Sequence, residues 1–488
     1  MKTQVVTLLA LLLFPPLIQA QTLVPDANFG VDGRVETGLG IVTNPSKTIL
    51  LQPDGKILVA GAQDVFPDNQ VGMIRRYLLD GRLDTTFAFQ THTPGIQAAT
   101  LQTDGALIGA TQTGWIRVSS DGDLDSNFAG PVFSELSNFS HTQLVSLPMG
   151  GWFSAGFENP PQQGGGWYLA KFKQNGMLDS SFAQNGLYQY HPSVLDRVFD
   201  VALQSDGKIV VVGSARSNGA QHIVLYRLWP NGVLDADFGQ NGSVSAAQFG
   251  AGEALDVAVD PDGKIVVAGY AHIFPEAAAL VLRYHPSGSL DDGFGVNGAC
   301  VVQEMARVGA LARDSLGQYW ASGISREGYR GVMACLDETG TLMPLDGTNT
   351  LFFPELATDT YHALSIHLLP TGGILTGSMV LNAEVAGVVL NRYVGQAFLS
   401  TQTAPARPTW VLFPNPARDF CSLLGENLPA EGQIQIQNVQ GKILQQTYFK
   451  GEKGALNGSL SPDLPAGPYV LSVFSSGKRV FQGLLLIQ

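Results

Sequence analysis

The stretch Leu203-Gln-Ser-Asp-Gly-Lys-Ile-Val-Val-Val-Gly213 decides the fold, because variants of it recur along the 488 residues of the chain. Close copies begin at Leu51 and Val259, and four weaker copies lie between and after them. Neighbouring copies are 45–57 residues apart, and a repeat of that length is typical of propellers and related architectures. Each copy carries a marker glycine at the same place: Gly55, Gly105, Gly150, Gly207, Gly263, Gly317 and Gly372.

Each repeat predicts four short antiparallel strands. An Asp-Gly pair between alternating apolar residues is a strong hairpin signal. A third apolar run and a second glycine turn follow, as in 223–227 and 231–232. The phrase Leu-Asp-x-x-Phe comes next and leads into a short fourth strand. It recurs at 83–87, 124–128, 178–182, 234–238 and 290–294. Seven such units predict an all-β fold, a seven-bladed β-propeller, whereas a β-solenoid usually has shorter coils and a sandwich seldom repeats its own sequence.

The two ends of the repeat region are predicted to close a ring. The last repeat ends at 388–393 and has no Leu-Asp-x-x-Phe phrase after it. An orphan copy of that phrase, Asp26-Ala-Asn-Phe29, stands near the N-terminus and is followed by a candidate fourth strand. We therefore expect residues 26–37 to complete the last blade, which would leave no exposed sheet edge.

At these residues the chain resembles the delta-60 repeat family, whose pattern is close to LDxxFGxNG followed by a DGKIVVAG hairpin. The resemblance covers about residues 23–395 and is clearest in the first, fourth and fifth repeats. It implies a bacterial propeller-like architecture. It brings no catalytic residues to this chain.

The sequence outside the repeats predicts three further segments. Lys2 and the apolar run 5–14 predict a signal peptide over residues 1–20, too short to span a bilayer. The repeats then fill a propeller domain over 21–397. A Ser-, Thr- and Pro-containing linker covers 398–409, and alternating strands predict a small immunoglobulin-like β-sandwich over 410–488.

The C-terminal segment is similar to the type A sorting domain of type IX secretion cargo. The matching pieces are an FPNP opening, a central Gly-Lys turn and an LPAG phrase. Their residues are Phe413, Pro414, Asn415, Pro416, Gly441, Lys442, Leu464, Pro465 and Gly467. This resemblance implies type IX export, the secretion machinery as a partner, and a secreted or outer-surface location.

Composition excludes several classes of partner. There are 28 Lys+Arg against 41 Asp+Glu, which gives a net charge of −13 and an estimated pI near 5.0. A nucleic-acid binder needs a basic face, so nucleic acid is not an expected partner. Beyond the signal peptide, no stretch is long and apolar enough to predict a transmembrane segment in the mature chain.

Two short motifs resemble cofactor or metal sites, but the residues around them do not fit such sites. Residues 293–298 spell GxGxxG, but they lie in a hairpin repeat and not between a strand and a helix. Residues 121–125 begin like a calcium loop, but Ser126 and Val132 stand where an EF-hand needs Gly and Glu. No cofactor or metal site is assigned, and calcium on another carboxylate cluster stays open.

The variable loops that face away from the short turns are the predicted binding face. Their aromatic residues could stack on a sugar or fill a protein pocket: Phe66, Trp167, Phe274 and Tyr329. Asp200 and Asp256 occupy equivalent sites seven residues before marker glycines. They are expected either to line the channel mouth or to bond to backbone.

We expect a non-catalytic protein that binds a protein or a glycan. One alternative is a carbohydrate-active hydrolase or lyase that uses Asp200 and Asp256 as its carboxylate pair. The other alternative is a purely structural component of the cell surface or matrix.

Overall fold

The structure is a computed structural model in two compact units, residues 1–399 and 400–488. It describes residues 23–39, 48–65, 69–88, 95–111, 114–126, 128, 139–158, 166–190, 196–217, 219–273, 276–327, 330–345, 351–352, 360–369, 373–381, 386–395, 411–413, 420–424, 431–437, 443–450, 455–459, 467–475 and 478–487. The predicted signal peptide and the predicted linker 398–409 lie outside the described residues.

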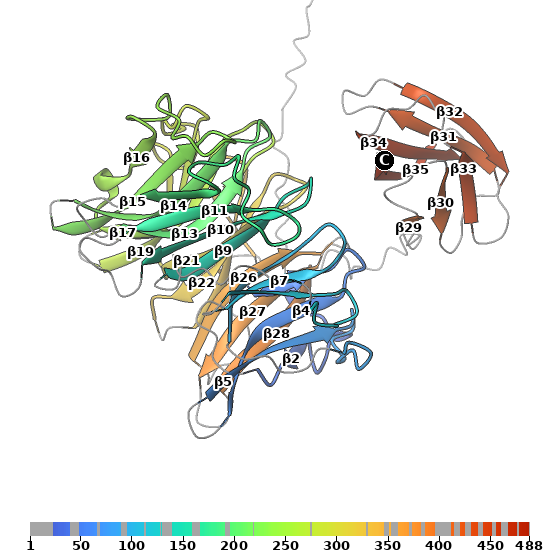
Figure 1. The fold of residues 1–488 in the computed structure, drawn as a ribbon, viewed down its shortest axis with the longest axis horizontal. Helices are drawn as coiled ribbons and strands as arrows, with labels where there is room; N and C mark the ends of the chain where they lie inside the picture. Colours follow the sequence, from blue (N-terminus) through green and yellow to red (C-terminus); the bar gives the residue numbers. More distant parts are fainter. Residues whose placement is uncertain are drawn as a thin grey trace, which may run out of the picture. The chain divides into compact units, whose positions relative to one another are not determined.

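In the described part of the first unit, the strands form seven antiparallel sheets, numbered here in chain order (Figure 1). The first sheet is β3 (Ile49–Leu51), β4 (Ile57–Val65) and β5 (Asn69–Tyr77). The second is β6 (Ile96–Leu101), β7 (Leu107–Thr111) and β8 (Gly114–Val118). The third is β9 (Phe139–Ser146), β10 (Trp152–Glu158), β11 (Trp167–Phe172) and β12 (Leu187–Tyr190). The fourth is β13 (Arg197–Leu203), β14 (Ile209–Ser217), β15 (Ala220–Leu228) and β16 (Ser243–Ser245).

The remaining sheets continue the same pattern. The fifth is β17 (Gly252–Val259), β18 (Ile265–Ile273), β19 (Glu276–Tyr284) and β20 (Ala299–Val302). The sixth is β21 (Met305–Arg313), β22 (Tyr319–Ser325), β23 (Gly331–Leu336), β24 (Leu342–Met343) and β25 (Leu351–Phe352). The seventh combines β26 (Thr360–Leu368), β27 (Ile374–Leu381) and β28 (Ala386–Gly395) with two strands from the N-terminal segment. A short 3-10 helix, η2 (Ala247–Phe249), precedes β17.

The hairpin turns follow from the repeated Asp-Gly pair. In the fourth sheet, Asp206 accepts a hydrogen bond from the backbone N–H of Lys208 at 3.1 Å through its side chain. Gly207 adopts a φ of +81°, which a residue with a side chain rarely takes, and its N–H bonds to the carbonyl of Gln204 at 2.9 Å. The turn therefore needs both residues of the pair, which explains why the pair recurs.

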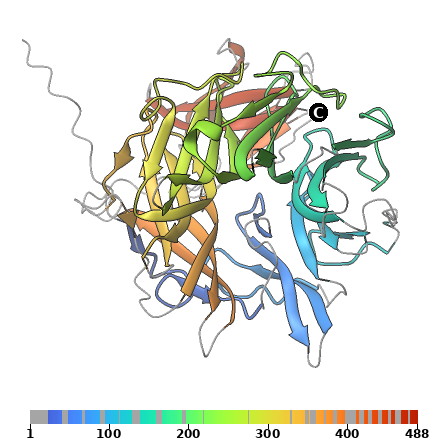
Figure 2. The same ribbon diagram turned by 90° about the vertical axis from the view of Figure 1, so that its left-hand side faces the viewer.

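Each sheet packs against the next one in the chain. Val210 and Val212 of the fourth sheet share a buried cluster with Ile265 and Val267 of the fifth. Equivalent clusters join the first sheet to the second, the second to the third, the third to the fourth, the fifth to the sixth and the sixth to the seventh. A further cluster joins the seventh sheet back to the first. The figures agree, because the orange strands of the seventh sheet lie beside the blue strands of the first (Figures 1 and 2).

The N-terminal segment completes the seventh sheet, as predicted. β2 (Arg34–Glu36) pairs antiparallel with β28, with Arg34 opposite Asn391. An additional strand, β1 (Leu23–Pro25), pairs with the end of β28, with Leu23 opposite Gly395. The prediction that residues 26–37 join the last sheet is confirmed, and the contribution of β1 extends it. In its described residues the unit is all-β, and its repeated antiparallel sheets are consistent with a β-propeller.

The second unit contains two antiparallel sheets in its described residues. One is β29 (Val411–Phe413), β30 (Phe420–Leu424) and β33 (Ala455–Ser459). The other is β32 (Ile443–Lys450), β31 (Glu431–Gln437), β34 (Gly467–Ser475) and β35 (Lys478–Ile487). Its buried apolar residues include Ile434, Ile436, Leu471 and Val473.

The sorting-signal residues fall partly outside the described structure. Phe413 ends β29 and Gly467 begins β34. The other predicted positions lie outside the described residues: Pro414, Asn415, Pro416, Gly441, Lys442, Leu464 and Pro465. Within the described residues of the whole chain, no helix has the length and apolar character to cross a membrane.

Candidate functional site

The two predicted carboxylates, Asp200 and Asp256, lie close together between neighbouring sheets. Asp200 Oδ2 accepts a hydrogen bond from the backbone N–H of Val257 at 2.9 Å, and Asp256 Oδ1 accepts from the same N–H at 3.1 Å. Asp256 Oδ2 also accepts from the N–H of Leu311 in the sixth sheet at 2.6 Å. The other oxygen of Asp200 accepts from the side-chain amide of Gln143 in the third sheet. These carboxylates therefore tie four consecutive sheets together.

Local strand geometry explains why both carboxylates face the next sheet. The pairing of β13 with β14 shifts register between Val198 and Asp200, and that of β17 with β18 shifts between Ala254 and Asp256. Such a bulge bends the strand and redirects a side chain. Asp200 is 2% exposed and Asp256 is 8% exposed. Of the two roles left open by sequence, bonding to backbone is the one that the hydrogen bonds show.

The predicted aromatic platform does not form at Trp167. Its ring is completely buried, with ring centroids of Tyr226 at 5.1 Å and Tyr188 at 5.3 Å. Trp167 begins β11, and its side chain belongs to the core between the third and fourth sheets. In this structure its ring is a packing element and cannot stack on a ligand at the surface. The other three aromatic candidates lie outside the described residues: Phe66, Phe274 and Tyr329.

A repeated ion cluster, which sequence reasoning missed, holds the short-turn face together. In the fourth sheet, Arg227 Nε donates to Asp235 of the Leu-Asp-x-x-Phe phrase at 2.8 Å, and Lys208 of the hairpin lies 3.4 Å from the same carboxylate. The guanidinium of Arg227 stacks 4.4 Å from the centre of the Phe238 ring. It also donates to the backbone carbonyl of Pro286 in the next sheet. Arg227 thus stabilises the turn of its own sheet through Asp235 and also bonds to the next sheet through Pro286.

The same cluster recurs around the unit. In the first sheet Arg76 pairs with Asp84 at 2.8 Å, and in the fifth Arg283 pairs with Asp291 at 2.7 Å. Asp84 has its pKa lowered to about 2 by hydrogen bonds from Thr86 and Arg76. Four arginines donate to a carbonyl of the following sheet at the equivalent place: Arg76 to Ser120, Arg227 to Pro286, Arg283 to Glu338 and Arg392 to Leu79.

The third sheet departs from this pattern at Lys171. Lys171 stands where these four arginines stand, and its ammonium pairs with Asp179 at 3.0 Å. Lysine has one nitrogen at the end of a flexible side chain. It therefore cannot bond to the aspartate and to a carbonyl of the next sheet in the fixed geometry of a guanidinium. Gly151 of the third repeat stands at the position of the hairpin lysine, which only the first, fourth and fifth repeats have. Its φ is +82°, and a Cβ there would lie 2.2 Å from the carbonyl oxygen of Phe172, so no side chain fits.

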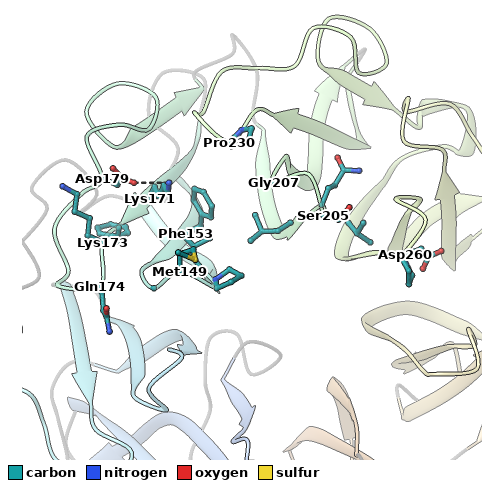
Figure 3. Close-up of a pocket in the computed structure, with 18 residues that line it drawn as sticks. Met149, Phe153, Lys171, Lys173, Gln174, Asp179, Ser205, Gly207, Pro230 and Asp260 are labelled. Carbon is teal, nitrogen blue, oxygen red and sulfur yellow. Dashed lines mark ion pairs between the residues drawn. The ribbon is translucent and has the colours of Figure 1, made fainter. Parts of the chain in front are cut away.

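A cavity of about 910 Å³ opens at this departure (Figure 3). Its walls come from the hairpin turns of the third, fourth and fifth sheets and from the second turns of the third and fourth. The lining residues are Leu147, Pro148, Met149, Gly150, Phe153, Lys171, Phe172, Lys173, Gln174, Asp179, Leu203, Gln204, Ser205, Gly207, Pro230, Val259, Asp260 and Pro261. The volume lies at the upper end of the range of about 300–1,000 Å³ usual for ligand sites.

The charged groups of the cavity are mostly paired. Besides Lys171, Asp179 accepts hydrogen bonds from Ser181, and these contacts lower its pKa to about 2. Asp260 accepts from the Tyr319 hydroxyl at 2.5 Å and lies 3.1 Å from Arg313, while burial raises its pKa. Lys173 is exposed and has no ionic partner among the described residues.

The cavity lies on the face of the short turns, whereas sequence reasoning placed binding on the variable loops. The signal that could have found it was present in the sequence. Lys171 stands where five other repeats have arginine: Arg76, Arg117, Arg227, Arg283 and Arg392. Among the described residues, no group of three or more His, Cys, Asp or Glu side chains is arranged to hold a metal ion.

The chain carries DUF5122 β-propeller repeats and a type IX secretion C-terminal sorting domain. Residues 52–87, 204–238 and 261–294 match the family described as a domain of unknown function (DUF5122) β-propeller. Residues 411–487 match the secretion system C-terminal sorting domain. The sorting domain indicates export to the cell surface or secretion and an interaction with the type IX machinery. No curated protein matches the chain.

Several solved structures are similar to the chain at low identity. PorZ, a bacterial surface component of the type IX secretion system of Porphyromonas gingivalis, is 12% identical with a TM-score of 0.37; the match covers 93% of this chain and 61% of PorZ. Polysaccharide lyase Uly1 is 10% identical with a TM-score of 0.47, over 73% of this chain and 91% of Uly1. The extracellular domain of BT4673 from B. thetaiotaomicron is 11% identical with a TM-score of 0.36, over 96% of this chain and 58% of that domain. The chain thus spans about three fifths of PorZ and of the BT4673 domain.

Proposed function

We propose that the chain is an exported, non-catalytic, seven-bladed β-propeller that binds a protein or glycan partner in the short-turn cavity. Each of the seven sheets would be one blade, and the seven shared cores that return to the first sheet support that count. Residues 1–20 would be removed as a signal peptide. Residues 21–397 would form the propeller, joined by the linker 398–409 to a sorting β-sandwich over 410–488.

One observation carries the binding proposal: the cavity lies where lysine replaces the arginine of the repeat. Four other blades have an arginine that donates to the next sheet at this place, whereas Lys171 of the third blade pairs with Asp179 and lines the cavity beside the fourth blade. Clefts that combine apolar walls with a few polar groups are the usual form of binding sites. If the replacement of arginine by Lys171 had left no cavity, a purely structural role for the protein would be favoured.

The hydrogen bonds and burial of Asp200 and Asp256 fit a non-catalytic role. Asp200 and Asp256 each accept a hydrogen bond from a backbone N–H of the next sheet, Asp256 also accepts from the N–H of the residue after it, and both side chains are buried. A general acid or nucleophile needs a carboxylate oxygen that can reach a substrate. We therefore propose that these residues hold the blades together and take no part in chemistry.

A cavity-blocking variant tests the proposal. Ser205 is exposed on the cavity wall, so Ser205→Trp should fill the space without disturbing the core. Thr103→Trp changes the equivalent turn position of the second blade, outside the cavity, and serves as the matched control. The purified chain and both variants would be applied to a glycan array and to a capped-peptide library. Saturable binding that Ser205→Trp abolishes and Thr103→Trp preserves is expected, and binding insensitive to both variants would remove the cavity as the site.

A further inference from the structure

We infer that the cavity receives an extended polypeptide segment that places a large apolar side chain beside an acidic one. This inference rests on the proposed function and specifies the partner of the same site. Three features of the cavity carry it: accessible apolar side chains, a buried acceptor that lacks a donor, and an exposed cation on the rim. Figure 3 shows Met149 and the cation, Lys173, among the lining residues.

The apolar surface of the cavity suits an aliphatic or aromatic side chain of a partner better than the face of a sugar. Sugar rings usually pack on an exposed aromatic face, but Phe153 is 3% exposed and Phe172 is 1% exposed. The accessible apolar groups are instead prolines, leucines and Met149, which is 97% exposed at the tip of its turn. Methionine is flexible and polarisable, and it adapts to inserted apolar groups.

The buried acceptor is the side-chain oxygen of Gln204. Gln204 is 7% exposed, and its amide nitrogen donates to the carbonyl of Gly263 at 3.3 Å. Its Oε1 has no hydrogen-bond partner among the described residues. Gln52 occupies the equivalent place in the first sheet and also has an unpaired oxygen, but it does not line the cavity. A buried acceptor without a donor is unfavourable, and rotation of the Gln204 side chain toward the cavity would let a backbone N–H of a bound strand satisfy it.

The rim cation is Lys173. Lys171, Asp179 and Asp260 all have charged partners inside the protein, so they offer little to a ligand. Lys173 is exposed with no ionic partner among the described residues, which leaves one uncompensated positive charge at the edge of the cavity. A carboxylate next to the inserted apolar group would complement it. A peptide supplies the apolar group, the N–H donor and the carboxylate together, which a neutral glycan does not.

The test is a positional-scanning library of octapeptides with acetylated and amidated ends, applied to the purified full chain. Capped ends ensure that any carboxylate comes from an Asp or Glu side chain. The expected result is selection of peptides with Leu, Ile, Phe or Met within two positions of Asp or Glu. The best peptide should bind at least fivefold more weakly to Met149→Ser and to Lys173→Gln, and its affinity for the wild type should fall as salt rises.

Two matched variants control for nonspecific effects. Leu316 precedes the marker glycine of the sixth blade, as Met149 does in the third, and is 69% exposed. Arg82 is an exposed cation on the second turn of the first blade. Leu316→Ser and Arg82→Gln should leave peptide affinity within twofold of the wild type. Because all four positions are exposed, unchanged melting temperatures are expected and would show that the variants fold.

The outcomes separate this inference from the proposed function. Absence of peptide selection, selection of basic or purely polar peptides, or equal effects of the cavity and control variants would overturn the peptide inference. If a glycan then bound in a manner lost with Ser205→Trp, the proposed binding function would stand with a different ligand. If neither probe bound in a Ser205-dependent way, both proposals would fall.

Discussion

Arg392, on the last strand of the seventh sheet, donates from Nε to Oδ2 of Asp26 at 2.7 Å, although 366 positions separate the two residues. The same guanidinium donates to the carbonyl of Leu79 in the first sheet and lies 4.8 Å from the centre of the Phe29 ring. One side chain therefore joins the N-terminal segment, the last sheet and the first sheet. It repeats at the ring closure the cluster that elsewhere joins sheets that are consecutive in the chain.

Breaking this closing pair should destabilise the first unit. The side chains of Arg392 and Asp26 are 13% and 12% exposed, so Asp26→Asn leaves a poorly solvated guanidinium without its counter-charge. We expect a loss of about 2–4 kcal/mol in the free energy of unfolding, measured by urea denaturation. As a control, Glu36→Gln breaks the more exposed Arg34–Glu36 pair and should cost less than about 1 kcal/mol. Equal effects would mean that the Asp26 pair does not stabilise the closure.

Asp200 and Asp256 are expected to stabilise the fold and to take no part in binding or catalysis. Asp200→Asn and Asp256→Asn keep the side-chain shape but turn one acceptor oxygen into a donor that faces an N–H. Each variant should lose about 1–3 kcal/mol of unfolding free energy because a buried donor becomes unsatisfied. Binding of the selected probe at a temperature where both variants are folded should not change. A variant with unchanged stability and lost binding or activity would assign these residues to the site instead.

Restoring the repeat in the third sheet should close the cavity. In Lys171→Arg, the guanidinium can pair with Asp179 and also reach toward the carbonyl of Pro230, which is equivalent to the Pro286 acceptor. We expect stability to rise by up to about 1 kcal/mol and the affinity of the cavity-dependent probe to fall severalfold. Calorimetry and titration of one protein preparation would measure both. Tighter probe binding together with lower stability would contradict the account of how the cavity arises.

His141 should make the first unit sensitive to acid. Burial lowers its pKa from 6.5 to about 4, and its Nδ1 contacts the buried hydroxyl of Tyr168. The unfolded chain therefore binds a proton more readily than the folded one. Stability should be full above about pH 6.5, should fall by about 3 kcal/mol as the pH drops to 4, and should fall no further from this group below that.

The variant His141→Gln isolates this contribution. It removes the titrating ring, so the slope of unfolding free energy against pH between 6.5 and 4 should become shallower than in the wild type. Asp179, with a pKa of about 2, contributes only below about pH 4 and does not overlap with this window. A slope that His141→Gln leaves unchanged would place the acid sensitivity elsewhere.

The sorting domain should be necessary for export. In a bacterium with a type IX system, a chain that ends before residue 411 lacks the whole matched segment 411–487. It is expected to accumulate inside the outer membrane, whereas the full chain should reach the surface or the medium. Protease accessibility on intact cells, with a periplasmic marker as control, measures the difference. Surface exposure of the truncated chain would show that another signal directs it.

Much of the first unit was predictable because its information is local. The Asp-Gly turns and alternating apolar runs specify hairpins through contacts between residues a few positions apart. The orphan phrase at Asp26–Phe29 even predicted which sheet the N-terminus completes. The role of Trp167 was not predictable in this way, because a strand-end aromatic next to a variable loop has the same sequence pattern whether its ring is buried or exposed.

The sequence by itself therefore determined the repeat, its hairpins and the closure of the last sheet on the N-terminal segment. Only the tertiary structure decided that Asp200 and Asp256 bond to backbone N–H groups of the next sheet, and that turns of three consecutive sheets line one cavity. The physical reason is distance along the chain. These features depend on how side chains from repeats more than fifty residues apart meet, and that geometry is set by packing between sheets and not by any local pattern.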